Sequence, residues 1–314
     1  MPAFTNYRTC LKRMRDTPLF YHRAKREGLD YDVLAARIML AQDPSMKSLA
    51  TQAMVEEWIW TRKGRPTLFV DSQTLPGQVL RLPVSGGISQ ILPRWGGYTA
   101  FVFRTGARAG KLDLCPVLFG YVTAQARHPM VEQAVQEILG APFKCEWATR
   151  PQDLLTMTIN THPYTQRLVI PVSDLDAIME HPVEWLDQHR LMDTFWSVEN
   201  SDKDRGMQAV HLRTILGLIV YAQAFPGALR GGLPDSCPPR NLGPGAKEHQ
   251  GQARTMKGFS THERPGDPFL RSAHFRVLGH ERFEHYPDGS PRVIPVRAAV
   301  VGGKIDAETM EVKP

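Results

Sequence analysis

The sequence predicts an α+β fold in which helices pack on an antiparallel or mixed β-sheet. Six runs rich in β-branched and aromatic residues are bounded by Gly and Pro, and a long apolar segment at about residues 204–225 has helical spacing. Of the 314 residues, 42% are apolar and 22% are charged, as in water-soluble globular proteins. A Pro/Gly-rich tether and a small basic C-terminal β module complete the predicted architecture.

Two helices are expected first. Residues 30–42 place apolar side chains at helical spacing, and the turn at residues 43–45 ends this helix and caps the next one, at about 46–60. Trp58 and Trp60 lie at the end of the second helix. Because they are two residues apart, they cannot share one helix face, so one of them is expected to line a groove or to begin the following loop.

The sheet is expected to follow, with further helices. The strands are predicted at residues 67–71, 78–82, 98–104, 117–123, 154–159 and 166–170. A helix is predicted at residues 128–139, and helical segments are predicted between 173 and 189. The apolar helix at 204–225 is expected to be central and buried.

The predicted domain organisation has three parts: an α+β body with a candidate peptide groove at residues 1–225, a tether at 226–270 and the basic β module at 271–314. Between residues 226 and 268, 15 of 43 positions are Gly or Pro. This composition favours a loop or tether over a packed core, which would make the module separable from the body.

The net charge of +6 is unevenly distributed. Residues 1–26 sum to +6 and residues 230–304 to +5, which leaves −5 for the rest of the chain. Two basic ends favour a surface that meets phosphate or an acidic peptide, although an ordinary solvated basic face has the same composition. The longest apolar run, residues 215–225, is too short to span a membrane, and the N-terminus lacks a signal-peptide pattern. A cytoplasmic protein without a membrane partner is expected.

The C-terminal segment alternates cationic or imidazole side chains with apolar ones, so in a strand one face would be positive and the other would pack. The candidates for contact with mRNA or ribosomal RNA are Arg271, His274, Arg276, His280, Arg282, Arg292 and Arg297. Guanidinium groups fork onto phosphate oxygens, and the interleaved Phe275, Phe283 and Tyr286 can stack on unpaired bases. A strand pair that is merely solvated on one face remains the alternative.

Catalysis is the sharper hypothesis for the same segment. His274, His280 and Glu281 offer the groups for general acid–base cleavage of RNA without a metal. Spacing alone does not show that the imidazoles converge, so structural histidines are favoured, and the enzyme prediction leans to no. The His-x5-His-x4-His spacing from His274 fits a metal site only weakly, because no Cys or third carboxylate lies at ligand spacing. Phosphate-binding loop motifs are absent from the sequence, so neither a metal nor a cofactor is expected.

Four aromatic residues are the candidates for a peptide-binding groove: Trp58, Trp60, Trp95 and Tyr98. Aromatic walls give a large contact area at low entropic cost, and they suit an extended or helical peptide. The alternative for all four is a place in the core of helix and sheet.

Three motifs occur in order along the chain. They are Leu92-Pro-Arg-Trp95 before the predicted strand at 98–104, the apolar helix running into Gly232-Leu-Pro234, and the tail His274-Phe-Arg276…Gly279-His280. Together they resemble the family of phage- and plasmid-borne type V-A anti-CRISPR proteins, which suppress synthesis of the effector nuclease. The resemblance covers most of residues 92–304 and is strongest in the tail.

The tail departs from the family pattern at three positions: Val277 replaces a second Arg, Leu278 is an extra residue, and Glu281 replaces a Trp. The resemblance implies a protein that binds the start of a nascent target polypeptide, such as a type V effector nuclease, and promotes loss of its mRNA during translation. The implied partners are the nascent chain and the mRNA or translating ribosome, in the cytoplasm of the bacterial host. The alternatives are an RNA-binding or ribonuclease-like regulator acting through the tail, and a direct protein inhibitor.

Overall fold

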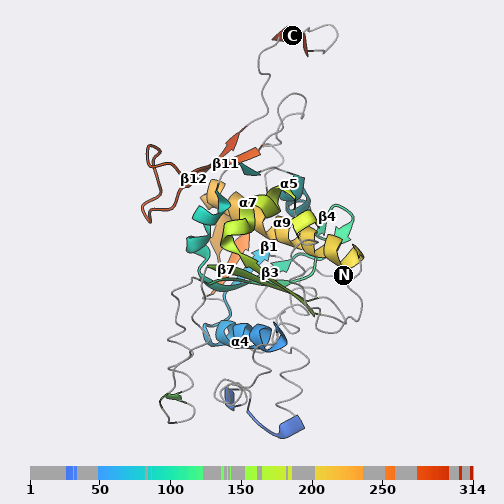
Figure 1. Cartoon of the computed structure of the whole chain (residues 1–314), viewed down its shortest axis with the longest axis vertical. Coiled ribbons are helices and arrows are strands. Elements are labelled where there is room, and N and C mark those ends of the chain that lie inside the picture. The colour runs from blue at the N-terminus through green and yellow to red at the C-terminus, as the bar shows by residue number, and fades with distance from the viewer. Residues whose placement is uncertain are drawn as a thin grey trace.

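A mixed seven-stranded β-sheet forms the centre of the protein in the computed structural model (Figure 1). The structure describes residues 26–30, 32–33, 49–81, 84–85, 87–122, 136–137, 140, 142, 153–160, 165–181, 183–185, 202–235, 252–258, 274–296, 304–305 and 312–313. The strand order is β8-β7-β6-β3-β1-β10-β9. The strands are β1 (Thr67–Val70), β3 (Gly97–Phe103), β6 (Val117–Val122), β7 (Leu154–Asn160), β8 (Thr165–Pro171), β9 (Leu229–Gly231) and β10 (Ala253–Met256).

Strand β1 is parallel to both of its neighbours, β3 and β10, while the other pairs in this sheet are antiparallel. The predicted α+β class with a mixed sheet is therefore confirmed. Parallel strands need a crossover connection, and helix α5 (Leu75–Arg81) lies in the connection from β1 to β3. The predicted strand at 78–82 is wrong for this reason, because a short apolar run has no period that separates a strand from a buried helix.

Helices cover both faces of this sheet (Figure 1). Helix α9 (Asp202–Ala224) lies with α5 and α7 (Leu175–Glu180) on one face, and its apolar side chains are buried in the main core. Helix α4 (Leu49–Arg62) packs on β3 and covers the other face. Because neither face is open to water, strand β7 buries both its apolar and its threonine side chains, from Leu155 to Ile159.

A smaller three-stranded sheet packs beside α9 and carries the C-terminal tail. Its order is β12-β11-β2, with β2 (Val84–Ser85), β11 (His274–Leu278) and β12 (Arg292–Val296). Strands β11 and β12 are antiparallel, and β2, which comes from the body of the chain, pairs with β11 in parallel. The tail is thus joined to the body through backbone pairing.

The predicted tether also contains sheet structure. Strands β9 and β10 both lie within residues 226–270, and β10 pairs directly with β1 in the centre of the large sheet. The expectation of a continuous tether is wrong at these two strands, because an averaged Gly and Pro content does not exclude short segments that pair with existing strands. Most of residues 236–273 lies outside the described residues.

Several other predictions fall mainly outside the described part of the chain, namely the helices at 30–42 and 128–139 and the side chains of Arg271 and Arg297. The helices predicted at 46–60 and 204–225 are confirmed by α4 and α9. None of the helices in the described ranges combines the length and hydropathy that crossing a bilayer requires.

Candidate nucleic-acid interface

Strand β11 separates a packed face from a solvated one. Phe275 and Val277 are buried, and the Phe275 ring meets the Phe225 ring edge-on at 6.2 Å. Arg276, on the opposite face of the strand, is exposed, and His274 is half-buried. The alternating sequence pattern therefore places the two kinds of side chain on opposite faces of the strand. The apolar side chains pack on the body, and the cationic ones point outward.

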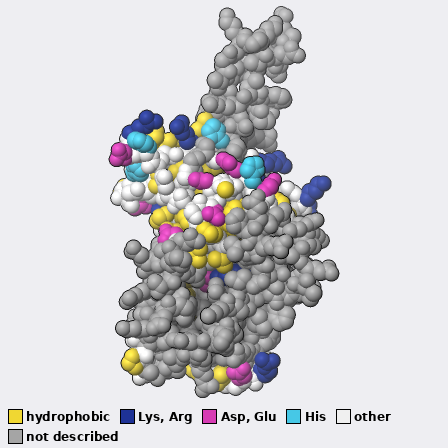
Figure 2. Space-filling view, viewed as in Figure 1, with side chains coloured by type: hydrophobic (Ala, Val, Ile, Leu, Met, Phe, Trp, Pro, Cys, Tyr) yellow, Lys and Arg dark blue, Asp and Glu magenta, His cyan; other side chains and the backbone are white. Residues whose placement is uncertain are grey.

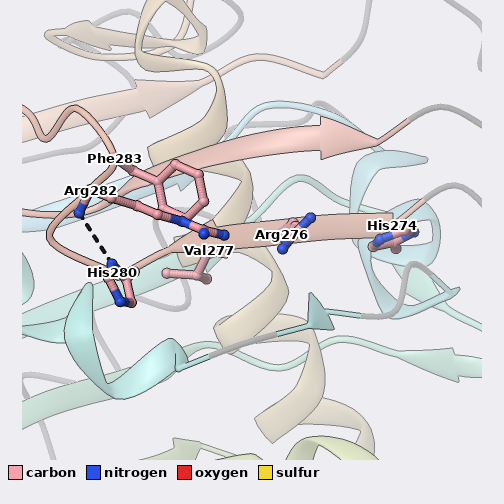
Figure 3. Close-up of a pocket in the computed structure, with 7 residues that line it drawn as sticks. His274, Arg276, Val277, His280, Arg282 and Phe283 are labelled. Atoms are coloured by element: carbon pink, nitrogen blue, oxygen red, sulfur yellow. Dashed lines mark hydrogen bonds between the residues drawn. The ribbon is translucent and has the colours of Figure 1, made fainter.

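A hollow lies along β11 and the turn that follows it, with a volume of about 540 Å³ (Figure 3). Its lining residues are His274, Arg276, Val277, Gly279, His280, Arg282 and Phe283. The backbone N–H of Arg282 donates to Nδ1 of His280 at 3.2 Å, which holds the turn. The Arg282 guanidinium lies over the Phe283 ring, 4.7 Å from its centre. This places a cation and an aromatic face together at one end of the hollow.

Gly279 explains how the turn fits against the body. A Cβ atom at this position would lie 1.7 Å from Oε1 of Gln90, which is far inside van der Waals contact. Gln90 belongs to the short 3₁₀ helix η2 (Ile88–Gln90). Any side chain at position 279 would displace Gln90, so glycine permits this close approach between tail and body.

The exposed cations of the hairpin divide into paired and unpaired groups. Arg292 forms an ion pair with Glu284 at 3.0 Å. Arg276 and Arg282, by contrast, have no carboxylate partner among the residues that the structure describes, and both are exposed. Figure 2 shows Arg and His side chains with carboxylates between them on the hairpin, at the upper left of the described surface. The two unpaired guanidinium groups are the ones that can accept an external anion.

A polar network fixes the β11–β12 connection to the body. Arg94, in the 3₁₀ helix η3 (Leu92–Trp95), pairs with Asp288 at 2.7 Å and donates to Oε1 of Gln223 at 2.7 Å. Gln223, at the end of α9, donates to Ser290 Oγ at 3.2 Å and to the Pro291 carbonyl at 3.0 Å. The Tyr286 hydroxyl donates to the Gln223 carbonyl at 2.8 Å. The connection is therefore held by contacts from two separate elements of the body.

Asp288 is ionised within this network. Hydrogen bonds from the hydroxyl and the backbone N–H of Ser290, together with the nearby Arg94 charge, lower the pKa of its carboxyl group. The Arg94 guanidinium also lies 5.2 Å from the centre of the Tyr286 ring. Sequence reasoning did not find Arg94 and Gln223, and a contact across 129 residues has no local signal.

The two histidine candidates for catalysis do not converge. Figure 3 shows His274 at the far end of β11 from His280. A strand advances about 3.3 Å per residue, so the four steps from His274 to Leu278 alone span about 13 Å. Glu281 is exposed on the turn. An acid–base pair needs both groups within hydrogen-bond reach of the reacting atoms, and His274 and His280 lie too far apart to form one.

The four groove candidates are core residues. Trp58, Trp60, Trp95 and Tyr98 are 1%, 0%, 6% and 3% exposed. Trp58 Nε1 donates to Asp32 at 2.8 Å, Trp60 Nε1 donates to the Pro66 carbonyl at 2.8 Å, and Trp95 stacks on Phe101. The prediction that they line a peptide groove is wrong, because the packing of α4 and η3 on the sheet covers all four.

Among the described residues, no group of three or more His, Cys, Asp or Glu side chains is arranged to hold a metal ion. His211 is buried, but its Nδ1–H donates to the Met207 carbonyl at 2.8 Å and its Nε2 accepts the Cys115 N–H at 3.0 Å, so both ring nitrogens are used structurally.

Comparisons with protein-family models, curated proteins and solved structures found no match.

Proposed function

We propose that the protein binds single-stranded RNA through the β11–β12 hairpin and that it acts as an RNA-binding regulator. The observation that carries the proposal is the hollow in which Arg276 and Arg282, both exposed and without a carboxylate partner in the described part of the chain, lie with the Phe283 ring. Guanidinium groups bind phosphate oxygens, and an aromatic face stacks on a base. A base within a duplex is already stacked and paired, so this combination favours an unpaired strand.

The resemblance to type V-A anti-CRISPR proteins supports a more specific role. In that role the bound RNA is the message of a target protein such as a type V effector nuclease, engaged while it is translated. The nascent-chain half of this role loses its four aromatic groove candidates, because all four are buried. Binding is favoured over cleavage, since His274 and His280 lie apart.

The test is RNA binding by two matched double variants. The first, Arg276→Ala with Arg282→Ala, removes both unpaired cations of the hollow. The control, Arg108→Ala with Lys111→Ala, removes the same charge from the exposed β4–β5 turn, between β4 (Arg108–Ala109) and β5 (Leu112–Asp113). In Figure 1, β4 lies on the opposite side of the molecule from the hairpin. Binding of a labelled oligouridylate is measured by fluorescence anisotropy at several salt concentrations.

We expect the hollow variant to bind RNA about tenfold or more weakly, while the control binds as the wild type does. Each phosphate contact on a single strand contributes about −0.7 to the slope of log K against log salt, so loss of two contacts should reduce the slope by about 1.4. Wild-type binding that does not weaken with salt, or equal loss in both variants, would overturn the proposal.

A further inference from the structure

A second group of cations lies in the loop between α4 and β1, and the backbone there is held in a fixed shape. Gly64 and Arg65 have left-handed backbone conformations, with φ of 75° and 58°. The Arg65 N–H donates to the Trp60 carbonyl at 2.9 Å, and the Gly64 N–H donates to the Thr61 carbonyl at 3.1 Å. A non-glycine residue in this region is uncommon and persists where its surroundings determine it. The loop therefore presents its side chains in a defined direction.

Lys63 projects from this loop onto the start of β3. A Cβ atom built at Gly97 would lie 3.2 Å from the Lys63 Nζ atom, so the ammonium group lies against the Gly97 backbone. Gly97 itself has a φ of 87°, which a side chain would strain. Lys63 is exposed and has no carboxylate partner within the described ranges. An exposed cation is thus placed beside the turn that leads into β3.

Arg254 contacts the same turn at Trp95. Its guanidinium lies 5.3 Å from the centre of the Trp95 ring, and Trp95 stacks on Phe101 at 5.8 Å with an interplanar angle of 25°. Arg254 is exposed, and the structure pairs it with no carboxylate in the described part of the chain. Since Trp95 and Gly97 are separated by one residue, Lys63 and Arg254 both contact one short segment, although they are far apart in sequence.

This turn directly follows Arg94, the residue that anchors the hairpin to the body. Arg94, which precedes Trp95, contacts both Asp288 and the Tyr286 ring. A single short segment, residues 94–97, therefore connects the hairpin anchor to the two cations Lys63 and Arg254. Both carry positive charge that nothing in the described residues neutralises, as do Arg276 and Arg282 in the hollow.

We propose that Lys63 and Arg254 form a second phosphate-binding platform for the same RNA strand, so that the binding site extends from the hairpin across the 94–97 turn. This inference rests on the proposed function and assigns the site an extended single strand as its ligand. The hollow holds a base and its neighbouring phosphates, and the platform binds phosphates further along. Short RNA reaches the hollow only, whereas longer RNA reaches both.

The test compares oligouridylates of about 4 and about 16 nucleotides, which bracket the usual site size of single-strand binding folds. The platform variant is Lys63→Ala with Arg254→Ala, and Arg108→Ala with Lys111→Ala again serves as the charge-matched control. We expect the platform variant to bind the short RNA as the wild type does and to bind the long RNA about tenfold more weakly. The salt slope for the long RNA should fall by about 1.4, the value for two phosphate contacts.

Each other outcome overturns the inference in a different way. Unchanged affinity for the long RNA would show that the platform contacts no phosphate. Equal weakening for both lengths would place the effect in the hollow instead. Failure of the wild type to bind either RNA would remove the proposed function as well. The variant Arg254→Lys keeps the positive charge at this position, so it should bind the long RNA within about threefold of wild type. If Arg254 acted only by stacking on Trp95, Arg254→Lys should bind the long RNA as weakly as a variant with Ala at position 254.

Discussion

The pairs Arg167–Glu56 and Arg94–Asp288 both join segments that are far apart in the chain, yet their surroundings are opposite. The first pair lies between β8 and α4, with the side chains 0% and 4% exposed and the ions 2.5 Å apart. The second lies on the surface, with the side chains 38% and 44% exposed and the ions 2.7 Å apart. A buried ion pair and a solvent-exposed ion pair therefore have similar N–O distances.

Burial determines how much each ion pair contributes to the stability of the fold. A buried ion that loses its partner remains charged in a medium that solvates it poorly, so breaking a buried pair is costly. An exposed pair contributes little to global stability, because water solvates both ions when they separate. The buried pair therefore fixes α4 against the sheet, while the surface network orients one loop without determining whether the protein folds. The loop that it orients carries the proposed RNA site.

The largest expected effect comes from removing one member of the buried pair. Arg167→Met should lower the free energy of unfolding by about 3–5 kcal/mol, because Glu56 is left without its cation. Urea denaturation followed by circular dichroism measures this change. Arg167→Met combined with Glu56→Leu should recover most of the loss, since it removes both charges. A single variant within about 1 kcal/mol of wild type would show that the pair is not structurally important.

The next effect concerns pH. Burial lowers the pKa of His211 to about 4, against about 6.5 in an unfolded chain. Between these values the unfolded state binds the additional proton, so the stabilisation is complete above pH 6.5 and is lost as pH falls toward 4. The shift corresponds to a loss of about 3 kcal/mol across this window. The surface carboxylates whose pKa is lowered, such as Asp288, titrate below this pH window.

Stability measured by urea denaturation from pH 7 to pH 4 tests this assignment. His211→Gln should be less stable at pH 7 and should lose most of the slope in this window. Gln73→Ala, which removes a surface hydrogen bond and no titratable group, should keep the wild-type slope. If His211→Gln retains the full slope, another group is responsible for it.

A smaller effect is expected from close packing on the α4 face of the sheet. A Cβ atom at Gly120 would lie 2.6 Å from both Thr156 Oγ1 and the Tyr98 ring. Gly120→Ala should therefore cost about 1–3 kcal/mol in the free energy of unfolding, since either side chain must leave its position. Gly231→Ala on β9 is the matched control, because no atom of the described residues lies within 4 Å of its Cβ position. Equal stability of the two variants in urea would contradict this packing.

The sequence was informative where a periodic pattern determined one face of one element. The apolar spacing of α9 and the alternation of β11 predicted which side packs, and both predictions hold. The prediction failed for Trp58 and Trp60, which lie on different faces of α4. Both are buried all the same, because neighbouring segments bring Asp32 and the Pro66 carbonyl to the two indole N–H groups. One helix pattern carries no information about what surrounds the helix.

The same limit applies to the candidate site. Local alternation indicated Arg276 and Arg282 as outward cations, and the structure places both in one hollow. The anchors Arg94 and Gln223 were not predicted, since each acts through a partner more than fifty residues away. Arg292, expected to be free for RNA, is paired with Glu284 by the fold of the loop between β11 and β12. Side-chain type predicts possible chemistry, whereas availability depends on tertiary contacts.

The smallest effect on global stability, and the most specific for the hairpin, is expected for Gln223→Ala. The change removes the hydrogen bonds to Arg94, Ser290 and Pro291, with a cost of about 1–2 kcal/mol in the free energy of unfolding. Amide hydrogen exchange should accelerate in residues 280–291 well before the strands of the large sheet, because those strands lose no contact. RNA affinity should fall a few-fold, since Arg276 and Arg282 keep their charge but lose a fixed orientation.

Gln73→Ala, which removes one surface hydrogen bond to the Thr105 carbonyl, should leave exchange in the hairpin unchanged. Uniform acceleration of exchange throughout the protein would instead show that Gln223 supports the whole fold, and that hairpin and core form one cooperative unit.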